Sequence, residues 1–273
     1  MRRPVRVGDA IERLDNGLNV GHYNGYTLYS AYQPIFRYRD GEALDLAGLE
    51  GLIRPFVNDV SITPSLLFGQ TDPRDALFIE CMCQALHIRN YQSAAPIDCD
   101  LFININSAIY SDTASMEKEF EFMLGQLAIN GLSHTTIVFE LLETVPCCDE
   151  ILHWLRDFAA ERGVKFALDD FGRGASNLER YDLLKPDLVK IDSHLFGRAM
   201  HQKNELSQLS SLISRVHCDG GRVVVEGIES PDMLVQARVL GADLFQGYYL
   251  DTPHIPSHSF VEHTRPNFSQ SVH

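Results

Sequence analysis

Short apolar segments alternate with longer amphipathic segments along most of the chain. Eight of the apolar segments have the length and the β-branched content of strands. They are Ala31–Phe36, Leu46–Ile53, Leu101–Asn106, Thr136–Leu142, Lys165–Asp170, Leu188–Asp192, Arg222–Glu226 and Asp243–Tyr249. Most of the eight are apolar on both faces, which is typical of strands buried on both sides.

The intervals from the second strand onward carry helical patterns. Asp72-Pro73 and Ser230-Pro231 each place a capping residue before a proline, a combination typical of helix N-termini. The predicted helices are Arg74–Arg89, Met116–Leu127, Glu150–Arg162, Asn177–Leu184, Ser207–His217 and Pro231–Gly241. This alternation predicts an α/β fold, a (β/α)₈ barrel of the TIM type in one domain, with a doubly wound open sheet as the alternative. The 273 residues suit a barrel, which takes about 250.

Composition and charge exclude several classes of protein. Hydrophobic residues make up 45% of the chain and charged residues 22%, as in ordinary globular proteins. The 37 acidic residues outnumber the 23 basic ones, and a net charge of −14 disfavours DNA, RNA and anionic membranes as partners. We find no signal peptide and no apolar stretch of membrane-spanning length, so we expect a cytoplasmic protein without membrane insertion. The six cysteines lack zinc-site or CxxC spacing, which favours reduced thiols.

Polar side chains stand in or at the end of seven of the eight strands. These residues are Glu50, Asn104, Glu140, Asp169 with Asp170, Lys190, Glu226 and Gln246. In a barrel, the carboxyl ends of the strands form the face that carries active sites. Buried carboxylates are costly unless they share a cation or a hydrogen-bond network. Oxygen ligands without His or Cys favour Mg²⁺ or Mn²⁺, and two adjacent aspartates can divide between two ions, as in displacement at phosphorus. Lys190 is then a candidate to hold the attacking water, or simply a salt-bridge partner.

Eight sequence blocks in order carry a family resemblance. They are YQPIF (Tyr32–Phe36), EGLIR (Glu50–Arg54), NIN (Asn104–Asn106), ELLE (Glu140–Glu143), DDFGRG (Asp169–Gly174), KID (Lys190–Asp192), EGIE (Glu226–Glu229) and QGYY (Gln246–Tyr249). Together they resemble the EAL-domain cyclic di-GMP phosphodiesterases. The resemblance implies a modified barrel with one antiparallel strand, and hydrolysis of cyclic di-GMP to pGpG with Mg²⁺ or Mn²⁺. It divides the chain into an N-terminal extension (1–27), the barrel (28–256) and a C-terminal tail (257–273).

The resemblance also assigns roles to individual residues. Glu50, Asn104, Glu140 and Asp169 resemble the ligands of one metal, and Asp169 and Asp170 those of a second, with Glu226 beside it. Lys190 resembles the lysine that orients water, and Gln246 an outer polar group that helps to bind substrate. Glu143 resembles the glutamate that braces the Asp169–Gly174 loop, a region through which we expect a homodimer. The groups that resemble nucleotide contacts are Arg54, Gln33, Leu52 and Pro64.

Four positions depart from the family pattern. Gly51 replaces alanine in the signature, Asn106 replaces serine, Leu142 replaces threonine, and Arg173–Asn177 reads RGASN where TGYSS is usual. None of the four is a proposed metal ligand. Two other readings stay open: a catalytically weak EAL domain that acts as a cyclic di-GMP receptor or adaptor, and another Mg²⁺-dependent barrel enzyme of the enolase or Schiff-base aldolase kind.

Overall fold

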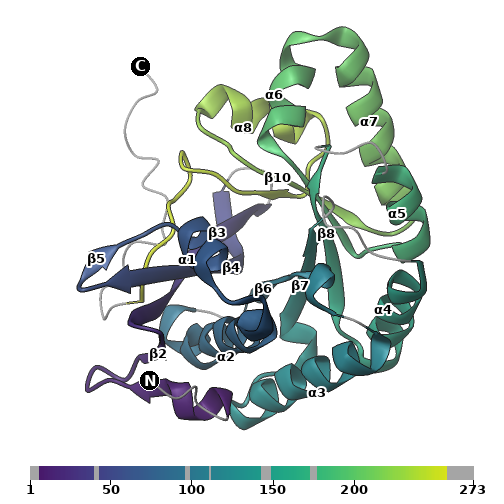
Figure 1. The fold of residues 1–273 in the computed structure, drawn as a ribbon. Helices are drawn as coiled ribbons and strands as arrows, with labels where there is room; N and C mark the ends of the chain where they lie inside the picture. Colours follow the sequence, from purple (N-terminus) through teal and green to yellow (C-terminus); the bar gives the residue numbers. More distant parts are fainter. Residues whose placement is uncertain are drawn as a thin grey trace.

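The computed structural model describes residues 6–39, 43–95, 99–110, 112–142, 149–172 and 177–256. Eight strands close into a barrel, and helices surround it (Figure 1). The barrel strands are β3 (Tyr26–Arg39), β4 (Ala43–Val57), β6 (Asp100–Ile105), β7 (Ile137–Leu142), β8 (Lys165–Phe171), β9 (Leu188–Ile191), β10 (Arg222–Val225) and β11 (Leu244–Phe245). Strand β3 runs antiparallel to both of its barrel neighbours, β4 and β11, whereas the other barrel neighbours are parallel. The predicted barrel with one antiparallel strand is therefore confirmed, and the open-sheet alternative is wrong.

All eight predicted strands are present, but two are much longer than predicted. Strands β3 and β4 form an antiparallel pair from Tyr26↔Val57 to Arg39↔Ala43 that extends beyond the barrel. Three short strands not predicted from the sequence continue the sheet beside this pair. They are β1 (Ile11–Arg13), β2 (Asn19–Tyr23) and β5 (Val60–Ser61). Strand β2 also contacts helix α2 (Ala76–Ala94), so the N-terminal strands lie against the barrel exterior at the purple end of Figure 1.

The six predicted helices are all present, with the bounds of α5 as predicted. They are α2, α3 (Thr113–Ile129), α4 (Asp149–Arg162), α5 (Asn177–Leu184), α7 (Lys203–Cys218) and α8 (Pro231–Val239). The Ser230 side chain caps α8 through Met233 N at 3.3 Å, whereas Asp72 caps a short 3₁₀ turn, Pro73–Asp75, that precedes α2. Helices α1 (Pro64–Gln70) and α6 (Ser193–His201) were not predicted. None of the described helices has both the length and the apolarity to cross a membrane.

Three layers of inward-facing side chains fill the barrel. The middle layer is apolar and consists of Ile35, Phe102, Val138, Ala167, Leu188, Val224 and Leu244. Because strand side chains alternate between faces, the residues two positions before and after each of these also point inward. Two positions before, on β6, β8 and β10, lie Asp100, Lys165 and Arg222. Two positions after lie the polar residues at the carboxyl ends of the strands.

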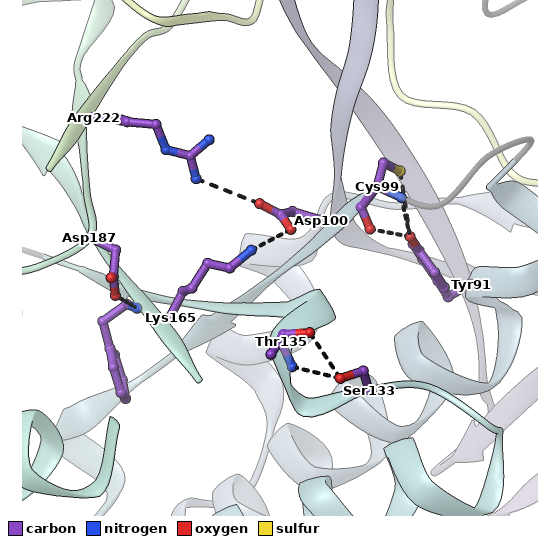
Figure 2. A network of polar contacts seen from close by, with 9 residues as sticks. Tyr91, Cys99, Asp100, Ser133, Thr135, Lys165, Asp187 and Arg222 are labelled. Carbon is purple, nitrogen blue, oxygen red and sulfur yellow. Dashed lines mark hydrogen bonds and ion pairs between the residues drawn. The ribbon is translucent and has the colours of Figure 1, made fainter. Parts of the chain in front are cut away.

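The lower polar layer holds the amino ends of the strands together (Figure 2). Asp100 Oδ1 lies 2.5 Å from Lys165 Nζ, and Asp100 Oδ2 lies 3.7 Å from Arg222 Nη2. In the same view, the backbone N–H of Phe166 donates to Asp187 Oδ2 at 2.9 Å. These contacts join β6 to β8 and β10, and β8 to the residue before β9, at the end opposite the candidate site, where barrels place residues for stability rather than chemistry.

Helix α2 approaches β4 at the glycine of the signature. A Cβ atom added to Gly51 would lie 2.7 Å from His87 Cγ and 3.0 Å from His87 Cβ. His87 is buried, and its Nδ1 lies 3.0 Å from Ser30 Oγ, so the ring has little freedom to move aside. The glycine that replaces the usual alanine of the signature therefore leaves open the space that His87 of α2 occupies.

We predict that Gly51→Ala destabilises the fold unless His87 is also made smaller. Forcing a methyl group into this contact should lower the free energy of unfolding by roughly 1–3 kcal/mol. In a His87→Ala background the same methyl group has room, so its cost should fall towards zero or reverse. Urea denaturation of the four proteins of this double-mutant cycle measures the coupling. Equal costs in the two backgrounds would contradict the proposed contact.

Candidate active site

The polar residues at the carboxyl ends of the strands converge on the Lys190 ammonium group. Lys190 stands on β9, where every residue is buried, and its own side chain is inaccessible. Its Nζ lies 2.6 Å from Glu140 Oε1, 2.8 Å from Glu226 Oε1, 3.2 Å from Asp169 Oδ1 and 3.6 Å from Glu50 Oε2. Four carboxylates, each from a different strand or strand end, thus meet at one cation.

Two amides fix the carboxylate of Glu50. Asn104 Nδ2 donates to Glu50 Oε1 at 3.3 Å, and Gln246 Nε2 donates to Glu50 Oε2 at 2.7 Å. Gln246 follows β11 directly, and its backbone is held by bonds to Val225 and Ile228. Both oxygens of Glu50 are therefore oriented from opposite sides, so its position depends on β6 and β11 together.

Strand β8 ends in an irregularity that separates the two adjacent aspartates. The pairing of β8 with β9 shifts between Leu168 and Phe171, and Asp170 has a positive φ of 56°. Non-glycine residues seldom adopt this conformation, and such strain is concentrated at functional sites. Asp169 points to Lys190, while Asp170 lies next to it on the bent segment and adds to its negative surroundings.

Burial makes this cluster difficult to ionise completely. Burial raises the pKa of Glu140 well above its usual value, and it raises the pKa of Glu226 to about 8, with Lys190 opposing both shifts. Burial also raises the pKa of Asp169. For Lys190, burial alone would lower the pKa, but the neighbouring carboxylates outweigh it and raise the pKa well above the usual value. One ammonium group thus offsets only part of the negative charge.

The oxygen atoms at this site fit a hard divalent cation. Both carboxylate oxygens of Glu140, Asp169 Oδ1 and Gln246 Oε1 are buried, and apart from the Lys190 ammonium group they meet no hydrogen-bond donor within the described part of the chain. Oxygen donors of this kind are the ligands that Mg²⁺ and Mn²⁺ prefer. No three His, Cys, Asp or Glu side chains among the described residues are already arranged to hold an ion, because the carboxylates close on Lys190 instead. The donor set fits the metal, although its present arrangement is that of a salt-bridge cluster.

Two cavities border the polar residues at the carboxyl ends of the strands. The first, about 530 Å³, lies between β4, β6, α1 and α2, and we call it the α2 cavity. It is lined by Leu52, Arg54 and Pro64, the predicted nucleotide contacts, and by Asn104. The second, about 380 Å³, lies beside β11, and we call it the β11 cavity. Its lining includes Gln33, Glu50, Glu226 and Gln246, so the five predicted substrate-binding residues divide between the two cavities.

Some predicted residues fall outside the part of the chain that the structure describes. Glu143 lies in the segment 143–148, and residues 173–176 of the loop beginning at Asp169 are likewise outside the described ranges. The role of Glu143 and the interface role of the loop stay predictions. So does the division into extension, barrel and tail, since residues 257–273 are also outside these ranges.

The sequence analysis missed three residues that helix α2 brings to the site. Glu80, Gln84 and His87 all line the α2 cavity. They stand at positions i, i+4 and i+7 of one helix, a spacing that places them on one face. The signal in the sequence that could have identified them is this row of polar residues, which we call the polar stripe of α2. The backbone N–H of Asn106 donates to Glu80 Oε1 at 3.1 Å, so this stripe is tied to the carboxyl end of β6.

Known proteins share this architecture and sequence pattern. The chain is 27% identical over 266 residues to the cyclic di-GMP phosphodiesterase RocR of Pseudomonas aeruginosa, covering 94% of this chain and 62% of RocR. It is 26% identical over 234 residues to the probable cyclic di-GMP phosphodiesterase PdeI of Escherichia coli, covering 83% of this chain and 29% of PdeI. The chain therefore spans less than two thirds of the length of either relative.

Solved structures show the same fold. A standalone EAL protein of Vibrio cholerae in its c-di-GMP bound form superposes with a TM-score of 0.72 at 22% identity, covering 84% of this chain and 93% of the other. The manganese/cy-diGMP complex of Klebsiella pneumoniae BlrP1 gives a TM-score of 0.72 at 24% identity, covering 86% of this chain and 58% of the other. The EAL domain family model matches residues 24–253. The chain therefore belongs to the EAL domain family.

Proposed function

We propose that the protein hydrolyses cyclic di-GMP to the linear dinucleotide pGpG with the help of Mg²⁺ or Mn²⁺. The observation that carries this proposal is an oxygen-rich cluster at the barrel mouth with two cavities bordering it. A cyclic dinucleotide has two bases in all, joined through its sugars and two phosphodiesters, so it suits a reactive cluster that two cavities border. The names of RocR and PdeI support the same activity.

We propose two divalent ions at the cluster. Glu50, Asn104, Glu140 and Asp169 would hold one ion, and Asp169 with Asp170 would hold the other, beside Glu226. When bound, the ions would supply positive charge for the phosphodiester and lower the pKa of water. The reaction adds one water molecule to a phosphorus atom and breaks its bond to a 3′-oxygen, which leaves a 5′-phosphate and a 3′-hydroxyl group.

The chain's own residues bind and orient the reactants. Lys190 is a buried donor at the centre of the cluster, a position from which it can hold the attacking water in line with the bond that breaks. Arg54 offers a planar pair of donors to a phosphate, in the cavity that Leu52 and Pro64 also line. Gln33 and Gln246 offer amides in the β11 cavity.

We also propose that two copies of the chain associate through the region around the Asp169–Gly174 loop. A groove of about 830 Å³ begins at this loop, and its apolar lining includes Phe171, Leu178, Leu195, Leu209 and Leu212. Leu178 is half exposed, which favours its burial by a second copy. Sedimentation velocity should show a dimer for the protein and a monomer for Leu178→Glu, and a monomeric parent would contradict the interface.

We also propose a cytoplasmic location, which would give the protein access to a soluble nucleotide.

A direct assay tests the activity. The purified protein is incubated with cyclic di-GMP and either Mg²⁺ or Mn²⁺, and the products are separated by chromatography. Formation of pGpG that stops on addition of EDTA is the expected result. Binding of cyclic di-GMP without any product would contradict the enzyme and indicate a receptor instead.

We predict that Asp169→Asn abolishes hydrolysis while the protein stays folded. The change keeps the size of the side chain but removes a ligand that both ions would share, so kcat/KM should fall by at least about a hundredfold. Asp169→Asn removes one negative charge from a buried cluster that has an excess of them, so the melting temperature should stay close to that of the parent protein. Glu50→Ala should behave in the same way. Full activity of either variant would show that the cluster is not the reactive site.

We predict that Lys190→Ala loses most of its turnover but still binds cyclic di-GMP. The change removes the group that orients water and leaves both cavities unaltered, so kcat should fall more than affinity. The matched control is Lys203→Ala, which removes an exposed lysine at the start of α7. Steady-state kinetics and calorimetric titration separate the two quantities. Unchanged kcat in Lys190→Ala would exclude the assigned role.

A further inference from the structure

Strand β6 loses its neighbours in the sheet at the point where it reaches the carboxylate cluster. Its pairing with β4 ends at Ile103, one residue before Asn104, and its pairing with β7 ends at Ile105. Asn104 therefore has a paired neighbour on one side only. The Asn104 side chain donates to Glu50 Oε1 at 3.3 Å, so its orientation depends on what holds the segment that follows β6.

A side chain of helix α2 holds this segment from outside the sheet. The backbone N–H of Asn106, the first residue after β6, donates to Glu80 Oε1 at 3.1 Å. Gln84, one turn further along α2, donates from Nε2 to the same oxygen at 3.4 Å, so the Glu80 side chain is itself oriented. Burial raises the pKa of Glu80 to about 7, and the bond from Asn106 opposes this rise because a donor favours the ionised form.

These contacts form a continuous path from α2 to the carboxylate cluster. Asn106 is two residues beyond Asn104, and Asn104 in turn orients Glu50. Groups that orient metal ligands without touching the metal change metal affinity by about ten- to a hundredfold. From the bond between Glu80 and the backbone that follows Asn104, we infer that Glu80 is a positioning residue for the metal ligands Asn104 and Glu50.

This inference rests on the proposed function, which makes Asn104 and Glu50 ligands of one divalent ion. A merely structural role for Glu80 would lower the stability of the protein without a specific effect on that ion. A positioning role lowers the affinity for the ion in a protein that is still folded. The test therefore measures the binding of Mn²⁺ alone, without nucleotide, so that the result does not depend on turnover.

Two substitutions of Glu80 separate its hydrogen bond from its charge. Mn²⁺ binding is followed by the electron paramagnetic resonance signal of the free ion. Glu80→Ala, which removes the acceptor, should weaken Mn²⁺ binding roughly tenfold or more. Glu80→Gln keeps an oxygen that can accept from Asn106 N, so its affinity should stay within about threefold of that of the parent protein. Both variants remove the same charge, so the difference between them reports the hydrogen bond.

A change on the other side of the bond tests the same contact. Asn106→Pro removes the backbone N–H and keeps Glu80, and the φ of −89° at this position is close to the range that proline allows. We expect Asn106→Pro to weaken Mn²⁺ binding as Glu80→Ala does. Asn106→Ser is the matched control, because it keeps the N–H and a side-chain oxygen that can accept from Ala108 N. It should bind Mn²⁺ as the parent protein does.

A double-mutant cycle shows whether Glu80 acts through Asn104. Asn104→Ala removes the ligand that the bond would position. Adding Glu80→Ala in this background should therefore change the Mn²⁺ affinity by less than about twofold. Thermal denaturation checks that each variant is folded.

The outcomes separate the inference from the proposed function. A loss in Glu80→Ala that Glu80→Gln largely restores, and that disappears in the Asn104→Ala background, supports the inference. An unchanged affinity in Glu80→Ala, an equal loss in Glu80→Gln, or a loss that adds to that of Asn104→Ala overturns it and leaves the proposed hydrolysis intact. A parent protein that neither binds Mn²⁺ nor forms pGpG overturns the proposed function, and the inference with it.

Discussion

A single buried ammonium group holds the functional end of this barrel together. Lys190 Nζ lies within 4 Å of four carboxylates that come from different strands or strand ends. Below it, the apolar middle layer excludes water, so each of these attractions acts in a medium of low polarity. The same medium makes the excess negative charge costly, which is why the carboxyl pKa values rise. A cluster of this kind needs positive charge, whether from Lys190 or from bound divalent ions, and with one ammonium group alone it can accept more.

Much of the site follows from a period of two residues along parallel strands. Most of the polar residues at the strand ends stand two positions after an apolar residue of the middle layer, as in Val138 and Glu140, or Val224 and Glu226. This alternation and the strand order could be read from the sequence, so the barrel and the converging side chains were predictable. The irregularity at Asp170 was not, because a positive φ at a non-glycine residue has no signature in the residue type.

Residues that reach the site through packing were beyond the sequence analysis. His87 is 36 positions from Gly51 in the sequence, and only the approach of α2 to β4 shows that the two share one space. Helix α1 has seven residues, too few for a periodic pattern to be recognised, and α6 follows β9 without a loop that would mark its start. The length of β3 and β4 was underestimated because their outer halves lie beyond the barrel and alternate between polar and apolar residues. In each case tertiary contacts, rather than local preference, set the structure.

Helix α2 packs against the signature strand and also holds the segment that carries Asn104. His87 fills the space that the glycine of the signature leaves open on β4, and Glu80, two turns earlier, holds the backbone of Asn106. Asn106 follows Asn104 by two residues on the same segment, and Asn104 in turn orients Glu50. The position of Glu80 therefore bears on the segment that carries Asn104. Of the two departures from the usual family pattern that lie beside α2, Gly51 leaves the space that His87 fills, whereas Asn106 meets Glu80 through its backbone N–H, a contact that serine would also make.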